Sequence, residues 1–159
     1  MQFFRKQVSI TIAIAACSVL LTACGESKVA QCTKLIQIVN KGNTLVNSKK
    51  DNSDAGTTKN LANALNNTAK EIEALELTDT NLKGFQTRLS KAFRELSKAL
   101  SNIAKALAQG KNSSTTLEGR EQIEKAKGEL AKAGQAANQA AENQDSLTSE
   151  LAGYCSSNR

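Results

Sequence analysis

The chain has 159 residues and a formal net charge of +6, contains no histidine and no proline, and is only 3% aromatic. Without histidine it lacks the commonest general base and the commonest metal ligand. It also lacks a glycine-rich phosphate loop and a Ser-Lys pair at a recognised spacing. We therefore expect no enzyme and no cofactor, and the scarcity of stacking aromatics argues against nucleic acid as a partner.

The first 23 residues have the organisation of an export signal. Arg5 and Lys6 form a short basic head, and residues 8–16 (VSITIAIAA) form an apolar core. A transmembrane helix needs about 20 apolar residues, which is more than this core provides. Extension of the apolar run to Leu21 brings it close to that length, so an uncleaved membrane anchor and an ordinary secretory signal are both open alternatives.

The apolar run ends in Leu-Thr-Ala-Cys at residues 21–24. Behind a basic head and an apolar core, this tetrapeptide resembles the lipobox of bacterial lipoproteins, the type cut by signal peptidase II. The resemblance implies cleavage before Cys24, a diacylglyceryl group on its thiol and an acylated amino terminus, which together anchor a protein stably. We expect a signal peptide at 1–23 and one lipid-anchored domain at 24–159, facing the periplasm, a lumen or the cell surface.

Removal of the signal leaves 136 residues and lowers the net charge to +4. Cys17 is lost with the signal and Cys24 carries the lipid, so Cys32 and Cys155 are left near opposite ends of the domain. An even pair in an exported protein predicts one disulfide, closing a loop of about 124 residues and worth roughly 5 kcal/mol. The alternative is two unpaired thiols. Two thiolates without histidine cannot complete a four-ligand zinc site, so we predict no metal site.

Apolar residues at helical spacing predict four helices, at roughly 28–48, 57–77, 80–109 and 116–153. The third helix has the widest apolar stripe, a pattern typical of a bundle helix. Its members recur every seven residues in three rows: Leu82, Leu89, Leu96, Ile103; Phe85, Ala92, Ala99, Ala106; and Phe93, Leu100, Leu107. The first helix carries Val29, Cys32, Leu35, Ile36, Val39 and Val46 on one side, and Gly42 is expected to bend or shorten it.

Polar residues ahead of each apolar stripe predict the helix starts. We expect Thr57 or Thr58 to cap the second helix and Asp79 or Thr80 to cap the third. Thr115 and Glu118 have capping-box spacing at the start of the last helix.

These elements predict an all-α fold, an up-down-up-down four-helix bundle that follows the cleaved signal. That order brings the start of the first helix and the end of the last to one pole, where Cys32 and Cys155 lie. The last helix contributes mainly alanine and contains Gly128 and Gly134, so its core is thin. A frayed tail is the alternative, and Tyr154 beside Cys155 argues against it.

The third helix also carries a basic ridge, which we define as Lys91, Arg94, Lys98 and Lys105. Residues 81–111 contain seven basic side chains and one acid, Glu95. The ridge lies opposite the apolar stripe, so it is expected to be exposed. It indicates a docking face for an acidic protein partner or anionic lipid headgroups. A merely solvated face, or one paired with the acidic end of the neighbouring helix, is the alternative.

Size, anchor and helix count are similar to those of the small lipid-anchored bundles on the lumenal side of cyanobacterial photosystem II, the PsbQ-like group. The similarity matches no motif residue by residue, so it implies a fold and not a function. Two hypotheses follow. The protein is a non-enzymatic accessory or binding module of an envelope or lumenal complex, or it is a structural surface lipoprotein whose basic helix contacts anionic headgroups without a specific protein partner.

Overall fold

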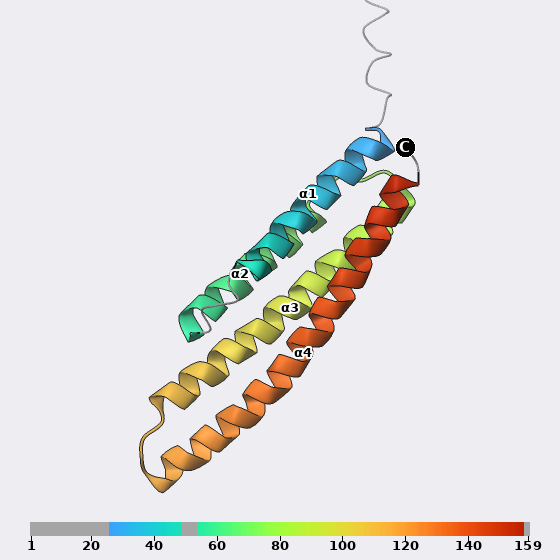
Figure 1. Ribbon diagram of the computed structural model, residues 1–159. Helices are drawn as coiled ribbons and strands as arrows, with labels where there is room; N and C mark the ends of the chain where they lie inside the picture. The colour runs from blue at the N-terminus through green and yellow to red at the C-terminus, as the bar shows by residue number, and fades with distance from the viewer. Residues whose placement is uncertain (1–25, 49–53, 158–159) are drawn as a thin grey trace, which may run out of the picture.

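A computed structural model describes residues 26–48 and 54–157, which form four α-helices and, within these ranges, no strand. The helices are α1 (Lys28–Asn47), α2 (Ala55–Glu73), α3 (Thr80–Asn112) and α4 (Leu117–Ser156) (Figure 1). The predicted all-α class is confirmed. The predicted signal peptide and the lipidation site Cys24 lie outside the described residues.

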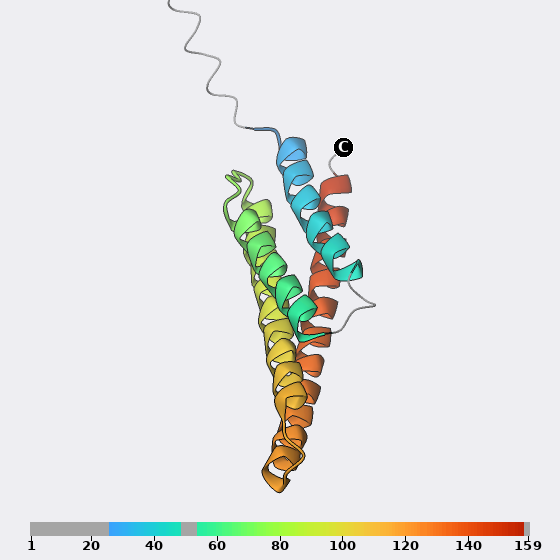
Figure 2. The same cartoon turned by 90° about the vertical axis from the view of Figure 1, so that its left-hand side faces the viewer.

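The helices differ in length, with 20 and 19 residues in α1 and α2 but 33 and 40 in α3 and α4. At 1.5 Å per residue, the first two are about 30 Å long and the last two about 50 and 60 Å. Figures 1 and 2 both show α3 and α4 extending beyond α1 and α2. We call the four-helix part the body, and residues 106–130 of the α3–α4 hairpin the arm.

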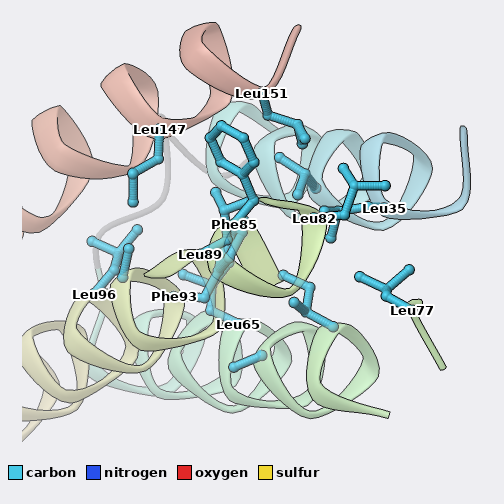
Figure 3. Close-up of a cluster of buried hydrophobic side chains, with 14 of the residues drawn as sticks. Leu35, Leu65, Leu77, Leu82, Phe85, Leu89, Phe93, Leu96, Leu147 and Leu151 are labelled. Carbon is cyan, nitrogen blue, oxygen red and sulfur yellow. The ribbon is translucent and has the colours of Figure 1, made fainter. Parts of the chain in front are cut away.

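The apolar core lies in the body, where all four helices contribute side chains (Figure 3). Full burial of one large apolar side chain contributes about 1.5–3 kcal/mol to the stability of the fold. The large aliphatic and aromatic residues with no exposed surface are Leu35, Val39, Leu65, Ile72, Leu82, Leu89, Phe93 and Leu151. Val29, which the sequence places on the apolar side of the first helix, is 51% exposed, because it lies in the first turn of α1, one turn before core contact begins at Cys32.

Gly42 allows α1 to approach its neighbours closely. A Cβ at this position would lie 2.5 Å from the Phe93 ring of α3 and 2.9 Å from Cγ2 of Thr68 in α2. The helix continues past Gly42 to Asn47, close to the predicted end at residue 48, so of the two expected effects of this glycine, bending or shortening, shortening does not occur. The absence of a side chain at Gly42 instead allows α1 to pack closely against α2 and α3.

The start of each later helix is fixed by a side-chain cap. Asp54 accepts hydrogen bonds from the backbone N–H groups of residues 56 and 57, so α2 begins before the expected threonine caps. Asp79 caps α3, as predicted, by accepting from Leu82 N. The cap of α4 is Thr116, one residue after the expected Thr115, and it accepts from Gly119 N.

Cys32 of α1 and Cys155 of α4 are joined by a disulfide, with 5.9 Å between their Cα atoms. Eleven residues further along α1, Asn43 accepts a hydrogen bond from Gln144, which lies eleven residues before Cys155. These two helices therefore lie side by side and run in opposite directions. Because α4 is helical through Ser156, its end is an ordered part of the body and not a frayed tail.

Candidate functional site

All four residues of the basic ridge are exposed on the outer side of α3. The opposite side of the same helix carries Leu89, Phe93 and Leu96, which are 0–3% exposed. The predicted exposure of the ridge is therefore confirmed. Whether it binds anything depends on how far its charges are neutralised within the protein.

Two members of the ridge form ion pairs within the protein and two do not. Arg94 pairs with Glu73 of α2, and Lys91 Nζ lies 3.9 Å from Glu95 Oε1 one turn along α3. Lys98 and Lys105 form no ion pair with any residue of the described chain. Pairing with the neighbouring acidic helix therefore accounts for Arg94 only, and the second half of the ridge keeps two uncompensated charges.

The ridge borders an open groove between α2 and α3 with a volume of about 340 Å³. Four cations line it, and Lys59 Nζ donates a 3.0 Å hydrogen bond to Ser101 Oγ across the groove. No carboxylate is among the lining residues, which are Lys59, Ala62, Asn63, Asn66, Arg94, Ser97, Lys98, Ser101, Asn102 and Lys105. The amide and hydroxyl groups between the cations supply further hydrogen-bond donors.

The other side of the ridge differs in charge. Between α3 and α4, Lys98 lines a groove that also contains Glu95, and Lys105 lines one that contains Glu129. A carboxylate therefore accompanies each lysine on the α4 side, whereas the α2 side presents cations alone. An anionic partner is best accommodated on the α2–α3 side of the ridge.

Exposed charges of this kind act collectively. A single exposed ion pair is worth about 0–1 kcal/mol and is screened by salt. Several like charges along one groove create a larger local potential, which attracts and orients an oppositely charged surface. The arrangement therefore suits an extended acidic surface better than one small anion.

Lys59 belongs to this site, but the sequence pattern did not predict it as a member. It lies 32 residues before Lys91, on another helix, and its own segment carries no basic pattern. Only the packing of α2 on α3 brings it beside Ser101. A sequence signal that would have placed it there is absent, because the register between the two helices is set by tertiary contacts.

At the disulfide pole, a polar network fixes the start of α1 against the start of α3. The Gln31 side chain, 2% exposed, accepts hydrogen bonds from the backbone N–H groups of Thr78 and Asp79 and donates to the carbonyl of Glu26. The Tyr154 hydroxyl donates to the Asp79 carboxylate at 3.0 Å. The chain ahead of α1 therefore leaves from a well-defined pole of the body.

No family model, curated protein or solved structure matches this chain. Within residues 26–48 and 54–157, no helix has both the length and the apolar character needed to span a membrane. Across the same residues, the side chains of His, Cys, Asp and Glu form no cluster of three suited to a metal ion.

Proposed function

We propose that this protein is an exported lipoprotein, anchored through Cys24, that acts as a non-enzymatic accessory or binding module of an envelope or lumenal complex. Its helices follow an up-down-up-down order, which the Cys32–Cys155 and Asn43–Gln144 pairs support for the first and last helices. The ridge docks an acidic surface of a partner protein. The membrane is its second partner, through the anchor.

The observation that carries this proposal is the pair of uncompensated lysines, Lys98 and Lys105, beside a groove lined by cations and without a carboxylate. A face that serves only for solubility requires no such segregation, since interspersed charges of both signs serve equally well. Segregation of one sign along one groove favours an oppositely charged partner.

The position of the ridge favours a protein partner over lipid headgroups. Cys24 is four residues before Lys28, so the anchor lies within about 14 Å of the disulfide pole. Lys91 and Lys105 are 11 and 25 residues along α3 from Thr80, which lies at that pole. At 1.5 Å per residue, they stand roughly 17 and 38 Å from it. An upright body therefore presents the ridge away from the membrane.

Charge reversal in native membranes tests this function. The Lys98→Glu/Lys105→Glu variant is expected to leave a larger complex and to migrate as the free protein on blue-native gels. A matched variant, Lys70→Glu/Lys125→Glu, has the same net charge but alters exposed lysines outside the α2–α3 groove, and it is expected to migrate with the wild type. If all three proteins migrate alike, the ridge is not a docking face.

A further inference from the structure

The apolar stripe of α4 continues from the body into the arm. Gln144 donates a hydrogen bond to Asn43, which shows that this side of α4 faces α1. One heptad closer to the arm, Ala137 is partly buried against the core. Further steps of seven reach Leu130 and Ile123, so these two residues lie on the same side of the helix.

The first helix does not reach these two residues. Because Asn43 lies beside Gln144 and α1 ends at Asn47, the end of α1 is opposite about residue 140 of α4. Leu130 is ten residues further, or roughly 15 Å at the helical rise. Both Leu130 and Ile123 are half-buried, and neither belongs to the core cluster.

Along one row of the apolar stripe of α3, burial likewise decreases from the body to the arm. Phe93 is fully buried, Leu100 packs partly buried against the core, and Leu107 is half-buried outside the core cluster. Leu107 of α3 thus joins Ile123 and Leu130 of α4 on the side of the hairpin that α1 and α2 cover in the body. We call these three residues the arm face.

Cations border the arm face. Residues three or four positions apart are neighbours on a helix, and this spacing places Lys111 beside Leu107, Arg120 beside Ile123, and Lys127 beside both Ile123 and Leu130. None of the acidic residues of the arm has this spacing from a member of the arm face; they are Glu118, Glu121, Glu124 and Glu129. Lys127 contacts Glu124 at 2.8 Å, whereas Lys111 and Arg120 form no ion pair with the described chain. The charge of Lys111 also acts on the Asp54 carboxylate at the start of α2, where, after the hydrogen bonds from Thr57, it contributes to lowering the pKa of that group, so Arg120 is the border cation without an acidic counterpart among the described residues.

We propose that the arm face binds an amphipathic helix of a partner protein, one whose apolar side is bordered by carboxylates. The helix takes the place that α1 occupies in the body and continues the same apolar layer. The inference rests on the proposed function for the existence of a protein partner, but it uses a surface separate from the ridge.

Charge and position favour an acidic helix over two other occupants of the arm face, a second copy of the chain and the membrane. Two copies of the arm packed face to face bring Lys111 and Arg120 of one copy toward the same cations of the other, which is unfavourable. The arm also lies at the end of the hairpin remote from the start of α1 and the end of α4 (Figure 1). An anchor at Cys24 is only four residues ahead of α1 in the sequence, and the arm is therefore far along the molecule from it. An acidic helix satisfies both the apolar layer and its cationic border.

The test uses the full chain in nanodiscs of neutral phosphatidylcholine and two designed, fluorescently labelled 18-residue peptides. Both peptides carry leucine at three- and four-residue spacing; one has glutamate beside the leucines and the other has lysine. Fluorescence anisotropy is expected to show at least tenfold tighter binding of the glutamate peptide. Binding that is absent, or equal for the two peptides, overturns the inference.

Variants then locate the binding. Leu107→Ser/Leu130→Ser is expected to weaken binding of the glutamate peptide at least tenfold. Lys111→Glu/Arg120→Glu changes only exposed side chains and is also expected to weaken binding of the glutamate peptide at least tenfold. This second variant tests whether the arm face is the binding site even if the first variant loses helix content by circular dichroism. The ridge variant Lys98→Glu/Lys105→Glu is expected to bind within twofold of the wild type.

Other outcomes identify other occupants and overturn the proposal. Loss of peptide binding in the ridge variant alone assigns it to the ridge. Concentration-dependent dimers that disappear in the arm variants assign the arm face to a second copy. Binding to anionic vesicles that depends on Lys111 and Arg120 assigns it to lipid. If the arm face does not bind the glutamate peptide but the Lys98→Glu/Lys105→Glu variant still leaves the larger complex on blue-native gels, the further inference is wrong and the proposed function stands.

Discussion

At the scale of single residues, Gly42 has no room for a side chain, because an added Cβ would lie 2.5 Å from the Phe93 ring. Gly42→Ala gains up to about 1 kcal/mol of helix propensity, but overpacking of a core typically costs about 1–3 kcal/mol. We expect a net loss of stability, measured as a lower free energy of unfolding in urea.

Gly84 of α3 is the matched control, since an added Cβ there meets nothing within 4 Å. Gly84→Ala is expected to stabilise the protein by roughly 0.5–1 kcal/mol through helix propensity alone. Equal effects of the two substitutions would show that close packing at Gly42 is unimportant.

Asp79 makes stability depend on pH. Leu82 N–H, and after it the Tyr154 hydroxyl, donate to its carboxylate and lower its pKa from the ordinary value. A carboxyl whose pKa is lower in the folded state stabilises the fold above its unfolded pKa of about 3.9, and this contribution is lost as pH falls through the folded pKa.

The Asp79→Asn variant keeps a capping side chain but does not titrate. It is expected to have a lower melting temperature than the wild type at pH 7, with a difference that shrinks toward pH 2. A difference that stays constant over that range would contradict the assignment to the charge of Asp79.

At the scale of elements, the apolar periodicity predicted all four helices, but the second was expected to run to residue 77 and ends at Glu73. Gln86 of α3 donates to the carbonyl groups of Ile72, Glu73 and Leu75, which supplies partners for the last turn of α2. A glutamine 13 residues away decides this helix end. Sequence reasoning about local caps has no access to such a contact.

The arm is expected to be the least stable part of the α3–α4 hairpin. Its inter-helix layer consists mainly of alanine, with Ala106 and Ala126 buried but no large side chain fully buried. Small residues bury little area, and α1 ends opposite about residue 140 of α4, before this segment is reached. Hydrogen exchange monitored by mass spectrometry is expected to show faster exchange in residues 106–130 than in residues 82–96. Equal protection of the two segments would indicate that the arm is already covered by a partner or a second copy.

At the scale of the whole molecule, the disulfide closes the chain between its first and last helices, over a sequence separation of 123 residues. Reduction is expected to lower the free energy of unfolding by up to about 5 kcal/mol. Urea unfolding with and without reductant measures the effect, and the Cys32→Ser/Cys155→Ser variant serves as the insensitive control. An unfolding midpoint that does not respond to reductant would contradict this contribution.

The candidate site was predictable in part. Lys91, Lys98 and Lys105 recur every seven residues, which is a local property of one helix, so their exposure could be predicted from the sequence. The α2 side of the groove was not predictable, because it depends on how α2 packs beside α3. Pairing of the ridge with the acidic end of the neighbouring helix was one of the predicted alternatives, but the sequence did not indicate that Arg94 alone would pair there, with Glu73. Contacts between helices, and not patterns within them, decide which ridge charges are uncompensated.

Docking of a protein partner on the basic ridge can be tested in the native membrane. The most direct measurement is photo-crosslinking in native membranes, with the probe at Lys98 and a control probe at the exposed Glu142 of α4. We expect one discrete protein adduct from position 98 and none from position 142. Lipid adducts alone, or no adduct from position 98, would contradict it.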